Sequence, residues 1–362
     1  AAGAEEKEEA APPPKRAATS APAAQTSADT IADTTADTPS HSEVPPVAPG
    51  VVPAEGRSLQ DVLRPVRAGL VVEQLAEGMS KAHAQRAQLR GVAEELMNRW
   101  DLWIAGQQHR IVELEAYVHG PQHPDPYTHS DEDQGMSGVW YFHKKGGTYK
   151  SGTFKGMDLS AGDAAAGVKC GLLVRSVLEA AASGKRAVTE GPCLVVDRIL
   201  ALNGKSSIKD FVAGRGAAEL SAETLDGLQL RLASVPRADV VWEAPRVGLV
   251  LRREEQNKTH SAGTPVAYVA RPYRFSTAPQ QLSKFRAGFA AAAHLGGLAD
   301  AEHLAQRLGL AKVQEYTSAV ERGLKSDSAE SFADKKIATQ GDLCELVGVC
   351  QAAMLRSGDG GM

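Results

Sequence analysis

The sequence contains few cysteines and no long apolar run. Its four cysteines, Cys170, Cys193, Cys344 and Cys350, match neither a CxxC zinc pattern nor a dense disulfide framework, so we expect reduced, buried thiols. No apolar run approaches the roughly 18 residues of a membrane span, and no charged-then-apolar signal segment occurs. The sequence therefore predicts a soluble, intracellular protein that does not cross a membrane.

Several nucleotide and hydrolase motifs are also missing. The glycines at Gly214 and Gly216 do not follow a strand in a GxGxxG arrangement, no P-loop sequence occurs, and no GxSxG sequence occurs. These absences argue against a dinucleotide-binding fold, a P-loop nucleotidase and a serine hydrolase of the GxSxG type.

Acidic charge is concentrated at the N-terminus. Residues 1–56 carry nine acidic and three basic side chains, a net of −6, whereas the whole chain carries −4, which leaves +2 for residues 57–362. The same segment is rich in Ala, Pro, Ser and Thr, and its apolar surface is too small to offset the entropy of ordering. We predict a disordered tail over residues 1–56. The mildly basic remainder weakly favours an acidic partner such as nucleic acid, but it also suits an ordinary enzyme.

Apolar spacing divides the remaining chain into regions. Spacings of three and four predict a helix from Ser58 that includes Val71, Leu75 and Met79, and a second helix over residues 84–100. A period of two predicts strands over residues 109–177, including a hairpin at VWYFHKKGGTYKSGTF, and Gly-Pro predicts a short helix at CLVVDRILAL.

The last third of the chain predicts two more strands and then helices. PRVGLVLRRE and AYVARPYRF have the composition of strands, and the residues after about 279 have helical spacing. We predict three parts: the tail 1–56, an α+β domain over residues 57–278, and a helical extension over residues 279–362.

The stretch RIVELEAYVHG places two glutamates inside a strand pattern. Alternation puts Glu113, Glu115 and Tyr117 on one face together with Ile111. Two carboxylates about 7 Å apart on one face repel, so one of them can hold its proton near neutral pH, as a general acid or base requires. Solvation of an exposed strand explains the pattern equally well. For Glu113, three roles stay open: a second acid, a partner for a cation such as Arg110, or a solvated side chain.

The loop HGPQHPDPYTH offers four metal ligands, His119, His123, Asp125 and His129. Their spacing matches no standard motif, because a Gly-Pro pair separates the first two histidines and prevents a shared helical face. A metal-dependent hydrolase is therefore the weaker alternative.

The predicted hairpin combines aromatic residues with Lys144, Lys145, Lys150 and Lys155. Basic side chains neutralise phosphates and aromatic rings stack on bases, so nucleic-acid contact is one interpretation. Lysines also protect edge strands from aggregation, and composition does not separate the two interpretations.

The order of the motifs carries a resemblance. RIVELEAYVHG, YTHS, GGTYKSGTFKGM, GLLVRSV, EGPCLVV, PRVGL and RPYRF together resemble the methylpurine (3-methyladenine, alkyladenine-type) DNA glycosylases over about residues 90–278. The resemblance implies a domain around a curved, mainly antiparallel sheet, similar to the barrel of formyltransferase C-terminal domains. It implies a protein that flips a damaged purine out of DNA and hydrolyses its N-glycosidic bond in base excision repair, with no metal and no cofactor. We expect a monomer whose partner is DNA, and another nucleic acid or a nucleoside stays open as the substrate.

The resemblance also implies residue roles. Glu115 looks like the general base that activates water, and Arg175 resembles the arginine that positions this water. Tyr117 resembles the ring that stacks on the flipped base, and His129 resembles the histidine on the other side of the pocket. Lys155 stands where the family has a wedging tyrosine, and DLSAG lacks the expected asparagine, so the chain looks like a divergent branch. The alternative is a non-catalytic nucleic-acid-binding module of the same fold that uses the four lysines.

Overall fold

The structure of the protein is a computed structural model that describes residues 57–77, 79–179, 187–251, 265–297, 300–333 and 337–357. The predicted tail, residues 1–56, lies outside these residues. The α-helices are α1 (Leu59–Arg67), α2 (Lys81–Arg99), α3 (Pro192–Leu202), α4 (Ile208–Phe211), α5 (Pro265–Val269), α6 (Ala287–Leu295), α7 (Ala301–Leu308), α8 (Val313–Leu324) and α9 (Gln340–Ser357). The strands are β1 (Trp100–Ile104), β2 (Gln107–Gly120), β3 (His123–Pro124), β4 (Ser137–Phe142), β5 (Lys144–Lys145), β6 (Thr148–Tyr149), β7 (Met157–Ala161), β8 (Lys169–Glu179), β9 (Val188–Glu190), β10 (Leu228–Leu232), β11 (Trp242–Ala244) and β12 (Arg274–Ser276). Short 3-10 turns are η1 (Glu132–Gly135), η2 (Gly152–Phe154), η3 (Ala217–Glu219), η5 (Pro279–Gln281) and η6 (Glu330–Phe332).

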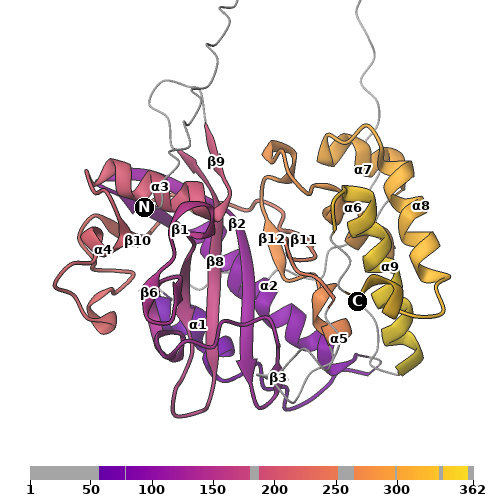
Figure 1. The fold of residues 1–362 in the computed structure, drawn as a ribbon, viewed down its shortest axis with the longest axis horizontal. Coiled ribbons are helices and arrows are strands. Elements are labelled where there is room, and N and C mark those ends of the chain that lie inside the picture. The colour runs from indigo at the N-terminus through magenta and orange to yellow at the C-terminus, as the bar shows by residue number, and fades with distance from the viewer. Residues whose placement is uncertain are drawn as a thin grey trace, which may run out of the picture. The chain divides into compact units, whose positions relative to one another are not determined.

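A ten-stranded, mainly antiparallel sheet forms the centre of the fold (Figure 1). Its main path is β10-β1-β2-β8-β7-β4, and β3, β9, β11 and β12 extend it from β2 and β8. The mixed architecture is the α+β class that the sequence predicts. The sheet does not close into a barrel, because no ladder joins its edge strands β4 and β10 among the described residues. The backbone of residues 220–222 lies between these two strands and forms hydrogen bonds with both.

Helices α1 and α2 cover one face of the sheet, and their start signals are local. The Ser58 and Ser80 side chains each accept a hydrogen bond from a backbone N–H in the first turn, at Asp61 and His83, which satisfies donors that a helix start leaves free. Apolar side chains of α1, α2 and the sheet form the main hydrophobic cluster, and each fully buried Leu or Val contributes about 1.5–3 kcal/mol.

The first predicted helix is shorter than its apolar spacing implies. Helix α1 ends at Arg67, where Gly69 at φ 75° and Leu70 at φ 54° turn the chain into the left-handed region. The later apolar residues Val71 and Leu75 are exposed, so their helical spacing is coincidental.

Two predicted strands are largely wrong. Strand β11 ends at Ala244, one residue before PRVGLVLRRE begins, and Gly248 at φ 81° turns the chain, so no residue from 245 to 250 lies in a strand. Leu251 forms an isolated bridge, and residues 252–254 lie outside the described residues. In AYVARPYRF the first residues belong to the helix α5, which starts at Pro265, and only Arg274–Ser276 form a strand.

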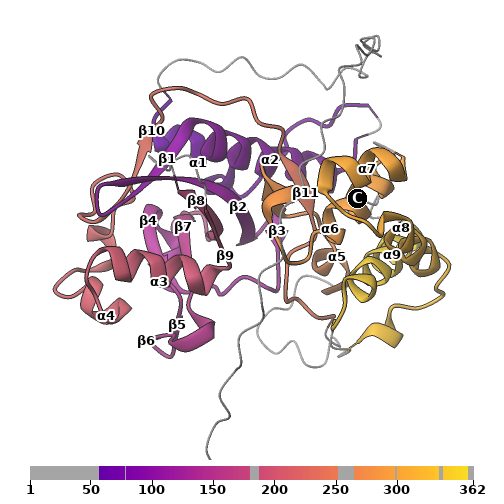
Figure 2. The ribbon, with the colours of Figure 1, turned by 90° about the horizontal axis from the view of Figure 1, so that it is seen from above.

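The hairpin prediction is correct in its turn and wrong in its length. Strands β5 and β6 have two residues each, joined by Gly146 and Gly147, whose φ values of 55° and 77° suit a type I′ turn. After β6 the chain leaves the strand and forms the 3-10 turn η2. The hairpin projects from the body of the molecule beside α3 and α4 (Figure 2).

Helices α6–α9 form the predicted helical region and pack around a second hydrophobic cluster, to the right in Figure 1. Helices α8 and α9 approach closely, since a Cβ atom at Gly348 would lie 2.1 Å from the Val320 carbonyl oxygen. Residues of β11 and α5, such as Ala244 and Val269, belong to the same cluster, so this packing reaches back before residue 279.

The cysteines are free and mostly buried, as predicted: Cys170, Cys344 and Cys350 are buried and Cys193 is half-buried. No helix among the described residues is long and apolar enough to cross a membrane.

Candidate active site

The two glutamates of β2 are buried. Glu113 is 1% exposed and Glu115 is 0% exposed, so solvation does not explain these carboxylates. A bulge in the β2–β8 pairing lies between Ile111 and Leu114 and resets the alternation of side chains. As a result Ile111 packs in the main cluster instead of sharing the glutamate face, and Val112 packs in a separate small cluster.

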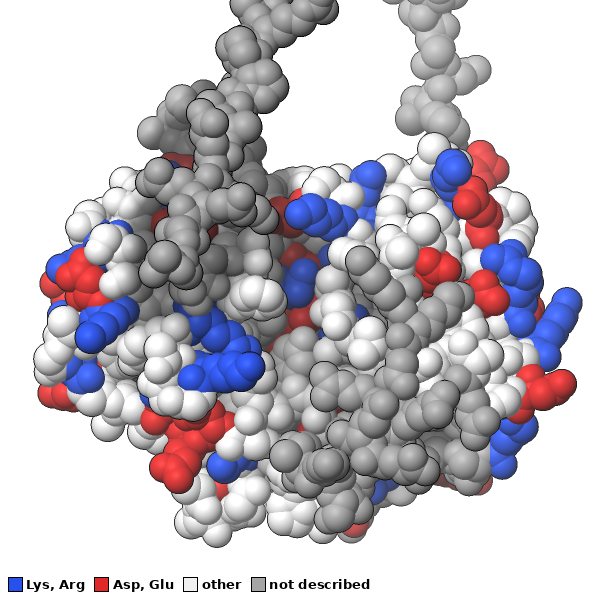
Figure 3. Space-filling model, viewed as in Figure 1, with Lys and Arg blue, Asp and Glu red and all other residues white. Residues whose placement is uncertain are grey.

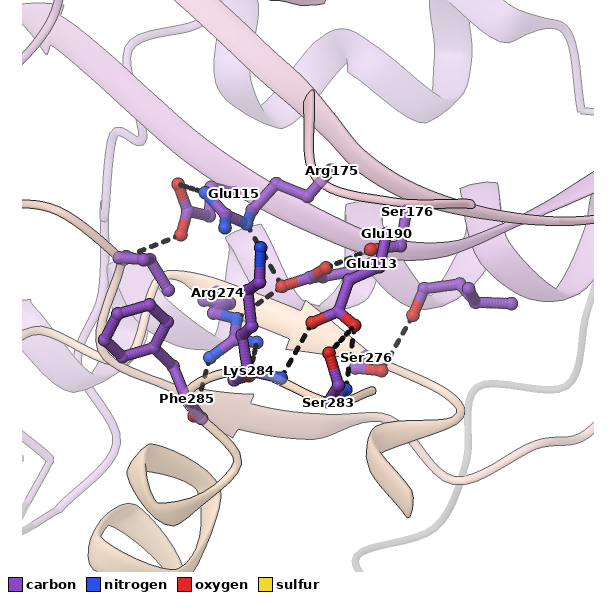
Figure 4. A network of polar contacts seen from close by, with 12 residues as sticks. Glu113, Glu115, Arg175, Ser176, Glu190, Arg274, Ser276, Ser283, Lys284 and Phe285 are labelled. Carbon is purple, nitrogen blue, oxygen red and sulfur yellow. Dashed lines mark hydrogen bonds and ion pairs between the residues drawn. The ribbon is translucent and has the colours of Figure 1, made fainter. Parts of the chain in front are cut away.

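Glu113 is the anchor of a buried ionic network (Figure 4). Its Oε1 accepts hydrogen bonds from Arg274 Nε at 2.6 Å and Arg175 Nε at 3.1 Å, and its Oε2 accepts one from the Ser176 hydroxyl. Arg110, which the sequence offers as one possible partner of Glu113, pairs with Asp239. Glu113 is therefore a structural partner of two arginines.

The charges in this network compensate one another. Burial alone raises the pKa of Glu113, but the guanidinium groups of Arg274 and Arg175 and the Ser176 hydroxyl outweigh it and hold this pKa below its usual value. Burial lowers the pKa of Arg175, but the carboxylates of Glu115 and Glu113 raise it above its usual value. The expected proton on one repelled glutamate is thus wrong for Glu113, because two cations share its site.

Glu115 is held by three donors. Its Oε1 accepts the Val247 backbone N–H at 2.7 Å, and its Oε2 accepts the Tyr117 hydroxyl at 2.8 Å and Arg175 Nη1 at 3.3 Å. A carboxylate has about four acceptor positions, so three donors do not exhaust its hydrogen-bonding capacity. Arg175 thus contacts both glutamates, and the structure brings the predicted pair of Glu115 and Arg175 together.

Tyr117 is fixed by a second buried ion pair. The Arg246 guanidinium lies 4.5 Å from the centre of the Tyr117 ring, and Arg246 pairs with Asp125, both side chains being fully buried. Burial and the neighbouring Glu115 carboxylate raise the pKa of Tyr117 well above its usual value, so this hydroxyl stays a donor.

The strand register places further residues on the face of Glu115. Glu115 is opposite Leu173 on β8, Leu173 is opposite Asp158 on β7, and Asp158 is opposite Tyr141 on β4. Directly opposed residues share a face, and two strand spacings separate the Cα atoms of Glu115 and Asp158 by about 10 Å. The sequence neighbours of this row face the main cluster: Leu172, Val174, Trp140 and Phe142.

His129 belongs to a polar cluster around Asp158. The Asp158 carboxylate contacts His143 Nε2 at 2.7 Å and accepts a hydrogen bond from Gln134 Nε2 at 2.9 Å. The His129 ring lies 4.5 Å from the His143 ring, and Lys150 Nζ lies 3.3 Å from His129 Nε2. Burial, together with His143, lowers the pKa of His129 to about 4, so its ring is neutral at pH 7.

The other predicted ligands do not form a metal site. His123 lies between the Val118 carbonyl oxygen and the Tyr273 hydroxyl, while Asp125 pairs with Arg246. In the described ranges no three His, Cys, Asp or Glu side chains are grouped closely enough to hold a metal ion.

The four predicted nucleic-acid contacts differ in environment. Lys144 pairs with Asp133, and Lys155 pairs with Asp197. Lys145 is exposed and Lys150 is half-buried. The aromatic side chain nearest in sequence to Lys155, Phe154, points outward and is exposed.

Comparison with known proteins relates the chain to a viral protein. No family model matches the chain. An uncharacterized protein of Acanthamoeba polyphaga mimivirus is 33% identical to it over an alignment of 170 residues, and this alignment covers 44% of this chain and 76% of the viral protein. The chain belongs to the family of that viral protein. Because the viral protein is uncharacterized, membership in this family assigns no activity.

Two buried arginines of the site were not predicted from the sequence. Arg246 lies in PRVGL and Arg274 lies in RPYRF, and both are about 1% exposed. A buried charge needs a partner, so an arginine in a largely apolar segment is the signal that could have indicated both residues. Their partners, Asp125 and Glu113, lie 121 and 161 residues away, so the sequence does not identify them.

Replacing Gly171 by alanine should disrupt the Asp158 cluster. A Cβ atom at Gly171 would lie 2.2 Å from Asp158 Oδ2 and 2.6 Å from Gln134 Nε2, so the carboxylate must move. We expect Gly171→Ala to lower the free energy of unfolding by about 1–3 kcal/mol, measured by urea unfolding. The control is Gly91→Ala on α2, where a Cβ atom meets no atom within 4 Å and a gain of about 1 kcal/mol is expected. Equal stability of Gly171→Ala and the wild type would show that Asp158 is free to move.

Acid should destabilise the fold through buried histidines. Burial lowers the pKa of His123, and that of His129, to about 4, and it also lowers the pKa of His109. The unfolded chain, with histidine pKa values near 6.5, therefore binds more protons between about pH 6.5 and pH 4, and stability falls as pH falls through this window. For His123 the loss amounts to about 3 kcal/mol. Urea unfolding at several pH values should show that the free energy of unfolding falls less with acid in His123→Gln than in the wild type or in His83→Gln, a control at an exposed site. If the free energy of unfolding depended on pH identically in all three proteins, His123 would not be the source of the acid sensitivity.

Proposed function

We propose that the chain hydrolyses the N-glycosidic bond of an alkylated purine in DNA, with Glu115 as the general base. The observation that supports this most directly is the environment of Glu115, whose carboxylate accepts hydrogen bonds from Arg175, the Val247 N–H and the Tyr117 hydroxyl, three donors for about four acceptor positions. The position of Arg175 beside Glu115 is what the resemblance to methylpurine glycosylases requires of a catalytic pair.

In the proposed reaction, a water molecule donates a hydrogen bond to Glu115 and attacks the anomeric carbon of the sugar. Glu115 takes the proton of this water, the bond from carbon to the base nitrogen breaks, and the electron pair leaves with the base. An alkylated purine carries positive charge, so it departs as a neutral base without needing a further proton. Arg175 steadies the water beside Glu115.

The base would lie on the polar face that Glu115 shares with Asp158. Tyr117 would stack on one side of the flipped base and His129 would line the other, as the resemblance implies. The neutral state of His129 at pH 7 suits this role, because a neutral ring does not repel a cationic alkylated purine. Opening this space requires the Tyr117 hydroxyl to leave Glu115.

That same hydrogen bond favours a second candidate function. Glu115 is fully buried, and its Oε2 accepts a hydrogen bond from the Tyr117 hydroxyl. Such an environment also suits a carboxylate with a purely structural role. The second candidate is a non-catalytic nucleic-acid-binding module that keeps the fold.

One experiment separates the candidates. The full chain is incubated with methylated duplex DNA, and free methylpurine is measured by chromatography while DNA binding is measured at several salt concentrations. Glycosylase activity predicts release of the free base. Binding that weakens as salt rises, with no base released, supports the binding module.

A further inference from the structure

A cationic groove lies beside the β5–β6 hairpin. It has a volume of about 510 Å³ and lies between the segment after β6 and the connection from α3 to α4. Three lysines line it, Lys150, Lys155 and Lys209, together with hydroxyl groups that include Ser151, Ser206 and Ser207. No aspartate or glutamate is among its lining residues. Lys and Arg side chains stand on the part of the surface where β6 and α4 lie (Figure 3).

Two of the three lysines lack a neutralising carboxylate. Lys155 pairs with Asp197, but neither Lys150 nor Lys209 forms an ion pair with any carboxylate of the described residues. Burial lowers the pKa of Lys150, and the nearby Asp158 carboxylate offsets only part of this effect. The groove therefore presents about two positive charges and several hydroxyl donors, which complement phosphate oxygens.

An exposed aromatic ring adjoins this groove. Phe154 lies in η2 between Gly152 and Lys155, which both line the groove, and its side chain is 76% exposed. No other large apolar side chain in the described part of the chain is more exposed. An exposed ring beside a cationic groove is the pairing by which proteins hold nucleic-acid strands, since bases stack on the ring while lysines track the phosphates.

We infer that this groove binds the sugar-phosphate backbone of a nucleic-acid strand, with Lys150 and Lys209 on the phosphates and one base stacked on Phe154. The inference deepens the proposed function and rests on it for the identity of the strand as DNA. A free nucleotide confined to the groove leaves the exposed Phe154 ring without a role. Phe154 also lies outside the lining, so only a ligand that extends beyond the groove reaches it.

The inference changes which lysines matter. The sequence gives no reason to prefer any one of Lys144, Lys145, Lys150 and Lys155 as a phosphate contact. In the structure, Lys144 and Lys155 are already paired with carboxylates. The inference adds Lys209, which lies 54 positions beyond Lys155 in the sequence and enters the groove from α4.

Fluorescence anisotropy with labelled oligonucleotides tests the inference. The full chain is titrated with a single-stranded 20-mer and with the duplex of the same sequence at several salt concentrations, and inorganic triphosphate serves as a competitor. The variants are Phe154→Ala, Lys150→Gln and Lys209→Gln. The matched controls are Leu355→Ala, an exposed apolar residue of α9, and Lys325→Gln, an exposed lysine at the end of α8.

We expect Phe154→Ala to weaken binding by about 10- to 100-fold, as loss of one stacked base does. Each lysine variant should weaken binding and lower the slope of log affinity against log salt by about one. The inference would be overturned if Phe154→Ala and Lys209→Gln bound the oligonucleotides as tightly as the control variants do. It would also be overturned if triphosphate displaced the oligonucleotide completely, and equally well from the wild type and from Phe154→Ala.

Base release measured on the same samples separates this inference from the proposed function. If the wild type releases the base and the groove variants bind DNA as tightly as the wild type, the groove inference is wrong and the proposed glycosylase function stands. If the groove variants bind more weakly and no base is released, the groove inference stands and the proposed glycosylase function is wrong.

Discussion

Glu113→Ala should lower the free energy of unfolding by about 3–5 kcal/mol. The substitution leaves Arg274, which is 1% exposed, without the carboxylate that accepts its Nε at 2.6 Å, and breaking a buried pair from one side costs this much. It also removes the acceptor of Arg175 Nε and of the Ser176 hydroxyl. Urea unfolding of the wild type and the variant at pH 7 gives the difference.

Two controls sharpen this prediction. The double variant Glu113→Ala, Arg274→Met removes both charges, so we expect it to recover part of the loss. Asp239→Ala breaks the partly exposed pair with Arg110 and should cost no more than about 1 kcal/mol. If Glu113→Ala costs as little as Asp239→Ala, the ionic network does not stabilise the fold.

Glu113 also joins the sheet to the start of the helical region. The Arg274 side chain that binds Glu113 donates to the Phe285 carbonyl oxygen, and the Glu190 carboxylate accepts the backbone N–H groups of Ser283 and Lys284 (Figure 4). These residues immediately precede α6. Loss of Glu113 should therefore loosen the segment before α6, measurable as faster amide hydrogen exchange at Lys284 and Phe285.

Glu115→Gln should reduce the single-turnover rate of base release by about 10²- to 10⁴-fold, the usual contribution of a general base. The amide keeps an acceptor for the Val247 N–H and nearly the same shape, so the variant should fold and bind DNA as the wild type does. The loss then appears in the chemical step, because an amide does not take the proton of the attacking water.

A matched substitution distinguishes base catalysis from a general effect of lost charge. Glu315→Gln removes an exposed carboxylate of α8 that pairs with Lys312, and we expect an unchanged rate. A Glu115→Gln rate equal to that of Glu315→Gln would remove Glu115 from the mechanism.

The sequence predicts the class of the fold well because periodicity reports local burial. Helix α2, the strand β2 and the two-glycine hairpin follow from spacing and turn residues. The failures occur where backbone conformation overrides spacing. Positive φ values at Gly69 and Leu70 end α1, and Pro265 starts a helix where strand-like residues follow.

The site is predictable only where one strand carries its residues. Alternation places Glu115 and Tyr117 on one face, and the apolar surroundings of Arg175 indicate a buried partner. The role of Glu113 depends on Arg274, which reaches it through the β2–β12 register across 161 positions. The bulge that moves Ile111 off the glutamate face likewise arises from pairing with β8, which local sequence does not encode.

The sequence is equally limited in predicting which lysines of the hairpin contact nucleic acid. Composition identifies its lysines, but ion pairing with distant carboxylates decides which of them are free to bind phosphate. Asp197 lies 42 positions after Lys155, and its pairing with that lysine follows from the packing of α3.

The products of one single-turnover reaction on methylated duplex DNA test the role of Glu115 most directly. We expect wild-type protein to release free methylpurine and to create an equal number of abasic sites, and we expect Glu115→Gln to do both about 10²- to 10⁴-fold more slowly. No free base from the wild type, or equal release by wild type and Glu115→Gln, would contradict the assignment of Glu115 as the base of an N-glycosidic hydrolase.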